Sequence, residues 1–354
     1  LRLKDKVGNR SNASGEVEFD DAHAVLVGEP GRGIATIMEM ATITRLCCVL
    51  GSAALLRQAT VQALAYARRR QAFGRPLAGQ PAMQGVLADL ALESEAAMLL
   101  GMQLAQAFEQ AGEAGDPAGG PASAAQAWQR IMTPAAKFWV CKRAIAASAE
   151  AMEVLGGNGY VEPSVLARLY REAPVNSIWE GSGNVMCLDV LRALRRAPES
   201  WPQLRASLLA LAQGDARIVA AVQLLDDGLR AGAAALQAQA RLWVQQLVLA
   251  AQAGLMRAHA PPDAGQDGIH RHHRKRGKDH RQGFAGEHSG TPFSPGTERG
   301  GDAQRSLRRG PPRAANPAVR RLLRHGNRHH QRSGDRFSLV AVPAVGRGCH
   351  HDRR

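Results

Sequence analysis

A long, proline-free stretch from Ile34 to Arg69 constrains the fold more than any other feature, because its apolar residues recur every three or four positions. This spacing predicts a helix, and the apolar residues cover so much of its circumference that we expect it to be buried. The same pattern recurs from about Pro81 to Ala111 and from about Ala122 to Leu155. With a further helix predicted after Gly183, the sequence indicates a mainly α fold containing a four-helix bundle of the up-down kind.

Two short apolar segments precede the first helix. Residues 14–20 alternate between polar and apolar side chains, and Ala24 to Val27 are apolar. They predict two strands at the end of a sheet whose other strands are missing. Because the sequence begins with Leu1 rather than Met, we expect it to be incomplete at the N-terminus.

The C-terminal part changes character near residue 260. Residues 201–258 continue the amphipathic helical pattern, and could pack on the bundle or present a surface to a partner. Residues 263–354 lack apolar periodicity and carry 20 Lys and Arg against 8 Asp and Glu, whereas residues 1–262 carry 25 against 23. Such a tail is expected to be disordered. It is either a basic arm that binds nucleic acid or, the favoured reading, the product of a reading frame that slipped in a GC-rich gene.

The cysteines and the hydropathy pattern bear on the cell compartment. None of the five cysteines has metal-ligand spacing, so no metal site is predicted, and free thiols suit a reducing cytoplasm. We find no signal peptide and no apolar run of about 18 residues, the length that a membrane span requires. We therefore expect a cytoplasmic protein that does not enter a membrane.

A single carboxylate, Glu180, stands out in the segment Asn176–Asn184. We predict a short helix over residues 164–172, extended backbone after Pro174, and a new helix capped by Ser182 or Asn184. Glu180 would then lie at an extended-to-helix junction, where side chains often face clefts.

The neighbours of Glu180 give two readings of its role. Beside Ile178 and Trp179 the carboxylate would be partly desolvated, which favours proton uptake and suits a general base. Gly181 and Gly183 would let the backbone approach a flat ligand. Alternatively, Glu180 is an acid favoured by a helix dipole and the glycines only turn the chain, which is the commoner case for these residue types.

Three motifs resemble a known family. Arg70-Gln71-Ala72-Phe73-Gly74 with Gln80, then Leu155 to Tyr160, then Trp179-Glu180-Gly181-Ser182, occur in the order and at the separations found in the C-terminal half of the acyl-CoA dehydrogenases. Within this family, the sequence most resembles the alkylation-response (AidB-type) branch, at residues 4–13, 151–155 and 174–184. The resemblance covers about residues 1–260 and favours the general-base reading of Glu180.

The resemblance implies an architecture and a cofactor. The family has an N-terminal helical domain, a middle β domain and a C-terminal four-helix bundle, with FAD held between domains and across the subunit interface of a homo-oligomer. Residues 1–30 would then end the β domain, 31–196 form the bundle, 197–260 a helical extension and 261–354 the disordered tail. The N-terminal helical domain would be absent.

The resemblance also implies residue roles. Glu180 matches the base that removes the α-proton of an acyl thioester while the β-hydride passes to FAD. Some members place this base one residue before an arginine of the first bundle helix; that position is Thr44, which cannot serve. Arg68 and Arg69 are expected at a solvated helix end, and Glu153 stands where the family often has glutamine. FAD contacts are implied for Arg70, Gln71, Ala72, Gln80, Glu153, Val154, Leu155, Gly156, Gly157, Ser182 and Asn184, and substrate contacts for Arg45 and Gly181.

Three functional hypotheses follow. The first is an FAD-dependent acyl-CoA dehydrogenase that uses Glu180 as its base. The second is a DNA-associated flavoprotein of the alkylation-damage response with weak dehydrogenase activity. The third is an inactive fragment of such a protein. In the second, duplex DNA would be contacted by arginines of the C-terminal helices, namely Arg192, Arg195, Arg196, Arg205, Arg217, Arg230, Arg241 and Arg257.

Overall fold

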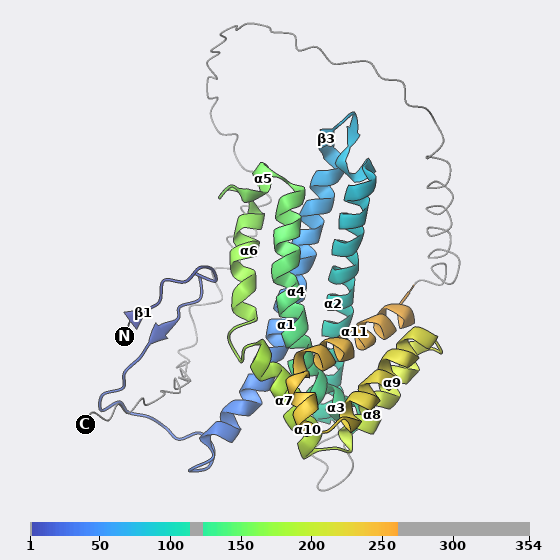
Figure 1. Cartoon of the computed structure of the whole chain (residues 1–354). Helices are drawn as coiled ribbons and strands as arrows, with labels where there is room; N and C mark the ends of the chain where they lie inside the picture. The colour runs from blue at the N-terminus through green and yellow to red at the C-terminus, as the bar shows by residue number, and fades with distance from the viewer. Residues whose placement is uncertain (1, 114–122, 261–354) are drawn as a thin grey trace, which may run out of the picture. The chain divides into compact units, whose positions relative to one another are not determined.

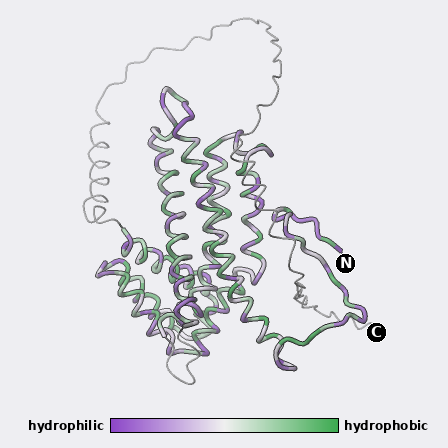
Figure 2. Tube along the Cα trace, turned by 180° about the vertical axis from the view of Figure 1, so that it is seen from behind, coloured by the Kyte–Doolittle hydropathy of each residue, from purple (hydrophilic) through white to green (hydrophobic). Residues whose placement is uncertain are grey.

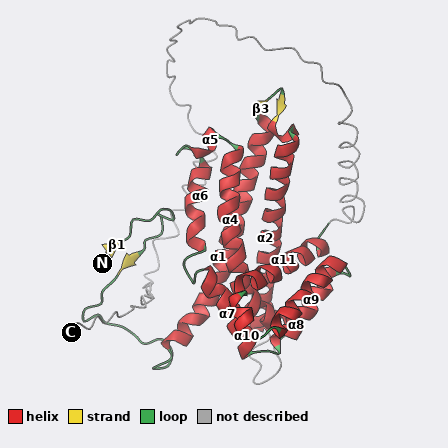
Figure 3. Cartoon of the chain, in the orientation of Figure 1, coloured by secondary structure: helices red, strands yellow, loops and turns green. Residues whose placement is uncertain are grey.

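Three long helical runs form the centre of the computed structural model, which describes residues 2–113 and 123–260 (Figure 1). They are α1 (Gly33–Arg69), α2 (Pro81–Glu113) and a run made of α3 (Ala124–Ala127), the π-helical segment η2 (Trp128–Met132) and α4 (Thr133–Val154). Both α2 and α4 pack against α1. The three long helices and the mainly α fold are therefore confirmed, and helix dominates the described chain (Figure 3).

The third helical run contains a π-helical turn that the periodicity did not predict. Pro134 follows η2 closely; its ring lacks an N–H and would crowd the carbonyl of Arg130 in a regular α-helix. A wider turn at residues 128–132 relieves this crowding. Trp128, Ile131 and Met132 remain buried in that turn.

Two short helices share the fourth side of the bundle. After α5 (Gly157–Tyr160), α6 (Val165–Asn176) packs on α1 and α4, and α7 (Gly183–Arg196) packs on α4 further along (Figure 1). The sequence assigned this side to the helix after Gly183 alone. The part played by α6 was missed because its predicted end was placed at residue 172.

The extended backbone predicted after Pro174 is wrong, because α6 continues through that proline to Asn176. A proline inside a helix costs about 3 kcal/mol. Burial of Leu166, Leu169 and Ala173 against the bundle offsets that cost, and the helix needs only two more residues. Tertiary packing thus outweighs a strong local signal.

Small side chains let the long helices approach closely. The α1 and α4 helices bury Ala59, Ala63, Ala144 and Ala151 completely. In α2, Gly101 lies close to α1, since a Cβ there would be 3.0 Å from Leu50 Cδ2 and would need that side chain to shift slightly. These close approaches fix the relative positions of α1 and α4, which carry the side chains of the candidate site.

The C-terminal extension packs on the bundle, which settles one of the two options left open by the sequence. It consists of α8 (Ser200–Ala212), α9 (Ala216–Arg230), α10 (Ala233–Ala238) and α11 (Ala240–Ala258). Helix α11 contacts α2, α4 and α7. The rings of Trp201 and Trp243 lie 5.7 Å apart, and Trp201 donates to Asp226. The predictions for residues 261–354 and for Cys349 fall outside the described residues.

The strand predictions at the N-terminus are only partly confirmed. β1 (Arg2–Leu3) pairs antiparallel with β2 (Gly15–Glu16). The strand predicted at Ala24–Val27 is wrong, because this hydrophobic stretch before α1 (Figure 2) forms no strand. Val25, Leu26 and Val27 are exposed. A strand needs a hydrogen-bonded neighbour, and no other strand of the described chain pairs with this stretch.

Helix α1 is only partly buried, contrary to the sequence expectation. Ile34, Met38 and Ile43 are exposed in its first turns, whereas Val49 and Leu56 further along are fully buried. By length and composition, α1 is also the one helix of the described residues that could cross a membrane. The hydropathy pattern of the sequence had predicted no such membrane-spanning segment. Core helices pass the same test, and α1 packs on α2, α4 and α6.

Candidate functional site

The turn between α6 and α7 holds Glu180 in an unusual backbone conformation. The amides of Ile178 and Trp179 both donate to the carbonyl oxygen of Val175, which closes the end of α6. Glu180 then has a φ of 58° and Gly181 a φ of 109°. The left-handed region costs a residue with a side chain about 1–2 kcal/mol, so contacts elsewhere must hold Glu180 there.

Two buried cations hold the backbone of this turn. Arg45 of α1 donates from Nε to the carbonyl oxygen of Glu180, at 3.1 Å. Lys137 of α4 donates from Nζ to the carbonyl oxygen of Gly181, at 2.7 Å. Arg45 and Lys137 are only 7% and 1% exposed as whole residues. Two consecutive carbonyl groups are therefore fixed by side chains from two different helices.

Arg45 is part of a buried ionic network. Its Nη1 lies 2.9 Å from Oδ2 of Asp189 in α7, and Arg130 of the π-helical turn donates to both oxygens of the same carboxylate. Arg192 lies 3.6 Å away from it. Burial alone would raise the pKa of Asp189, but the hydrogen bond and charge of Arg130, with the charges of Arg45 and Arg192, hold that pKa below its usual value.

Lys137 was not recognised from the sequence. Burial lowers the pKa of its ammonium group. Burial likewise raises the pKa of the neighbouring Cys48 thiol, and raises that of Cys141 to about 11. The sequence feature that could have identified Lys137 is its place inside the strongly apolar run Thr133–Val140, where an unpaired charge is costly.

The side chain of Glu180 is half-buried and uncommitted. Within residues 2–113 and 123–260, its carboxylate makes no hydrogen bond or ion pair. Trp179 donates from Nε1 to Oδ1 of Asn176, and Nδ2 of Asn176 donates to Oγ of Ser52. Ile178 is 64% exposed, so the expected apolar wall on that side of the carboxylate is not formed.

The start of α7 is shaped by glycines and by α11. A Cβ on Gly181 would lie 2.5 Å from Met186 Cε, so no larger residue fits without movement. Ser182 is the N-cap residue of α7, but its hydroxyl makes no capping hydrogen bond. Asn184 does not cap either: its Oδ1 accepts from Arg241 Nη1 of α11 at 2.9 Å.

A β-hairpin follows α1 and carries the first predicted FAD residues. β3 (Gln71–Ala72) pairs with β4 (Arg75–Pro76), and η1 (Leu77–Gly79) leads into α2. The side chain of Gln80 accepts from Arg75 Nε at 3.0 Å and donates to the Ala72 carbonyl at 3.2 Å. Arg70 and Gln71 are exposed, as are Arg68 and Arg69.

The second predicted FAD segment ends α4. Val154 is buried and Leu155 partly buried, whereas Glu153, Gly156 and Gly157 are exposed. Next to this segment, Asn158 donates to the hydroxyl of Tyr66 near the end of α1. This segment therefore lies near the same end of the bundle as the hairpin (Figure 1).

The predicted FAD residues form two separate groups. Arg45 contacts the Glu180 turn, whereas Arg70 ends the same helix 25 residues later. At 1.5 Å per residue, these points lie about 37 Å apart along the helix. The structure thus brings Glu180, Gly181, Ser182 and Arg45 together, but it separates them from Arg70, Gln71, Ala72 and Gln80.

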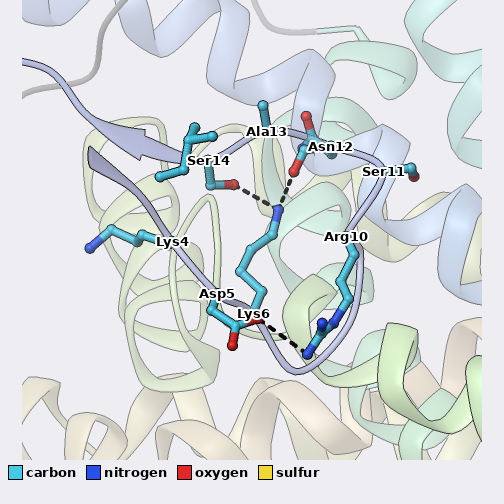
Figure 4. Close-up of a pocket in the computed structure, with 9 residues that line it drawn as sticks. Lys4, Asp5, Lys6, Arg10, Ser11, Asn12, Ala13 and Ser14 are labelled. Carbon is cyan, nitrogen blue, oxygen red and sulfur yellow. Dashed lines mark hydrogen bonds and ion pairs between the residues drawn. The ribbon is translucent and has the colours of Figure 1, made fainter. Parts of the chain in front are cut away.

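A surface pocket lies away from these residues. It is lined by residues 3–6 and 10–14 of the N-terminal loop, where Lys6 donates to Ser14 Oγ and to the Asn12 carbonyl (Figure 4). Arg10 pairs with Asp5. No predicted site residue lines it, and its own side chains fill the loop. In the described ranges there is also no cluster of three metal-ligating side chains.

Comparison with known proteins identifies the domain to which the site belongs. Residues 31–195 match the family described as "Acyl-CoA dehydrogenase, C-terminal domain". The putative acyl-CoA dehydrogenase AidB of Escherichia coli (strain K12) is 45% identical over 263 residues, 74% of this chain and 47% of that protein. Acyl-CoA dehydrogenase family member 11 of Caenorhabditis elegans is 35% identical over 193 residues, 54% of this chain and 30% of that protein.

A solved structure gives the same picture. Caenorhabditis elegans ACDH-11 in complex with C11-CoA superposes with a TM-score of 0.68 at 25% identity, over 75% of this chain and 47% of that chain. This chain therefore spans about half the length, or less, of the relatives it matches.

Proposed function

Because residues 31–195 belong to the acyl-CoA dehydrogenase family, we propose that this chain supplies the catalytic base and part of the cofactor site of an FAD-dependent acyl-CoA dehydrogenase. The observation that carries this function is Glu180 itself. Its backbone is held in a left-handed conformation by Arg45 and Lys137, while its carboxylate is uncommitted. Strain of this kind is retained where the position of a side chain matters.

The reaction class is α,β-dehydrogenation of an acyl thioester. The Glu180 carboxylate takes the α-proton, and the electron pair of that C–H bond forms the new double bond as the β-hydrogen leaves as hydride. FAD, when bound, supplies the acceptor for that hydride. The Gly181 amide has no hydrogen-bond acceptor among the described residues, so it is free to bind the thioester carbonyl and stabilise negative charge there.

The residues present suit FAD. Arg70 offers an exposed guanidinium for a phosphate, and Gln71 is exposed beside it. The side chain of Gln80 is bonded to Arg75 and to the Ala72 carbonyl, so it would have to exchange one of these bonds to contact FAD. The unused hydroxyl of Ser182 lies next to Gly181. Glu153 is the exception, since an exposed carboxylate near a phosphate would repel it.

The distance between the two groups of FAD residues supports a homo-oligomer. A separation of about 37 Å exceeds the reach of one dinucleotide cofactor, so one copy cannot use both groups for the same molecule. We infer that the hairpin of one copy and the Glu180 turn of another complete each site. This accounts for both groups without moving any helix.

Arg45 is less available for substrate than the sequence predicted. Its Nε and Nη1 are used by the Glu180 carbonyl and by Asp189. Its implied substrate contact stays a prediction, whereas its hydrogen bond to the turn gives it a positioning role.

The duplex-DNA alternative has no structural observation in its favour. Most of its arginines pair with acids within the chain: Arg192 with Asp189, Arg205 with Asp226, Arg217 and Arg257 with Asp215, and Arg230 with Asp227. An arginine in such a pair is less free to bind a phosphate.

We place the protein in a reducing cytoplasm, which its four described cysteines suit because all are free thiols.

The proposed dehydrogenase activity is tested by anaerobic titration of the FAD-loaded chain with acyl-CoA, followed by the loss of flavin absorbance. Wild type should lose its oxidised flavin bands and a Glu180→Gln variant should keep them. Glu95→Gln is the matched control, because Glu95 is an exposed carboxylate of α2 with no partner in the described residues.

A further inference from the structure

Lys137 is a buried cation whose hydrogen-bond acceptor is an uncharged carbonyl group. Its side chain is 1% exposed in α4, and its ammonium donates to Gly181 O. Removing an ion from water is costly, and a single hydrogen bond to a carbonyl returns only part of that cost. Replacing such a group by an apolar residue of similar volume is commonly neutral or stabilising. Stability alone does not explain this lysine.

The groups around Lys137 come from three elements. Arg45 and Cys48 face it from α1, Cys141 from its own helix α4, and Glu180 from the α6–α7 turn. Glu180 is the carboxylate among these groups, and its negative charge opposes the lowering that burial causes in the pKa of Lys137. The hydrogen bond to Gly181 O keeps the Lys137 ammonium beside Glu180.

Lys137 and Arg45 act on consecutive carbonyl groups. Arg45 holds Glu180 O and Lys137 holds Gly181 O, which fixes the orientation of the peptide units on both sides of Gly181. Both residues of this pair have positive φ. With both carbonyls drawn toward the cations, the left-handed conformation is retained and the carboxylate is left free.

We propose that Lys137 is a positioning residue whose ammonium, together with Arg45, holds the Glu180–Gly181 backbone so that the Glu180 carboxylate meets the α-carbon of the substrate. This role rests on the proposed function of Glu180 as the base. Loss of the ammonium should therefore release the turn without unfolding the bundle.

The backbone can be observed without any catalytic assay. Glu-Gly occurs once in the sequence, at residues 180 and 181. Full-length chain labelled with ¹³C-carbonyl glutamate and ¹⁵N-glycine therefore gives a single carbonyl–amide NMR correlation for this peptide bond. In Lys137→Met we expect this correlation to move by more than its linewidth or to broaden. Lys4→Met, which changes an exposed lysine of the N-terminal loop, should leave it in place.

Stability and pH separate positioning from simple packing. Lys137→Met should unfold at the same or a higher temperature than wild type, because it removes a buried charge at similar volume. In wild type, raising the pH should shift the Glu180–Gly181 correlation as Lys137 loses its proton, at lower pH than for an exposed lysine. Lys137→Met should lack this step. A correlation that is unmoved in Lys137→Met would overturn the positioning role.

Activity adds a second test. A misplacement of about 1 Å can cost about 100-fold in rate, so kcat of Lys137→Met should fall by about that factor with KM little changed. Lys137→Arg, which keeps a cation, should recover part of the loss. If Glu180→Gln is active while Lys137→Met still shifts the correlation, the assignment of the base fails and the backbone contact stands. If Glu180→Gln is inactive and Lys137→Met keeps full kcat, the positioning role fails and the base stands.

Discussion

The guanidinium of Arg45 holds the backbone carbonyl of Glu180 at 3.1 Å, across 135 positions of sequence. The same guanidinium is paired with Asp189 at 2.9 Å. One buried side chain of α1 therefore connects the conformation of the α6–α7 turn to the first part of α7. Stability and site geometry are coupled through this network.

Removal of the shared carboxylate tests that network. In Asp189→Ala, the buried Arg45 loses its counter-charge, and we expect the free energy of unfolding to fall by about 3–5 kcal/mol. Arg130→Ala removes a partner that is 43% exposed and should cost about 1 kcal/mol or less. Urea denaturation of both variants measures the difference. Equal costs would contradict the assignment of Arg45 as the buried member of the network.

The pH dependence of stability follows from the same carboxyl group. The pKa of Asp189 is lower in the folded chain than in the unfolded chain, so its ionic contribution is complete above the ordinary aspartate range. That contribution is lost as the pH falls through the lowered folded pKa, because the unfolded chain takes up the proton first. Asp189→Asn should therefore show a shallower acid decline of stability than wild type. An unchanged slope in urea denaturation at several pH values would contradict this.

Gly181 should tolerate a side chain poorly. Its φ is 109° and a Cβ would lie 2.5 Å from Met186 Cε, so we expect Gly181→Ala to lose more than about 1 kcal/mol of stability. Gly85 of α2 is the matched control, because its Cβ position is open and Gly→Ala in a helix gains about 0.5–1 kcal/mol. Thermal unfolding should thus move in opposite directions for the two variants.

Arg70 should bind FAD from the hairpin. Loss of a charge-assisted hydrogen bond worth about 1.5–3 kcal/mol predicts an FAD affinity about 10- to 100-fold weaker in Arg70→Ala. Arg69→Ala removes a neighbouring exposed arginine and should leave the affinity unchanged. Flavin fluorescence titration measures both.

Because the site is proposed to need two copies of the chain, FAD affinity should also fall on dilution. Analytical ultracentrifugation can relate this fall to dissociation of the oligomer.

The sequence predicted the features that depend on local periodicity. The long helices ending at Arg69 and near Leu155 follow from apolar spacing and from the glycines after Leu155. The site itself depends on distant residues. Nothing local to Glu180 predicts a left-handed residue there, since its conformation is held from positions 45 and 137.

The errors have a common physical cause. Pro174 predicts extended backbone, but burial of Ala173 on the bundle outweighs the cost of the proline. The apolar side chains of Ala24–Val27 predict a strand, although a strand is stabilised by pairing that the described chain does not provide. In both cases tertiary contacts, which one sequence does not reveal, decide the local structure.

The most direct test of Glu180 as the catalytic base is an anaerobic titration of the FAD-loaded chain with acyl-CoA. Flavin absorbance is followed for wild type, Glu180→Gln and Glu95→Gln. With Glu180 as the base, wild type and Glu95→Gln should lose their oxidised flavin bands, and bleaching by Glu180→Gln should be slower by about 100-fold or more. Bleaching of Glu180→Gln at the rate of wild type would contradict the central claim.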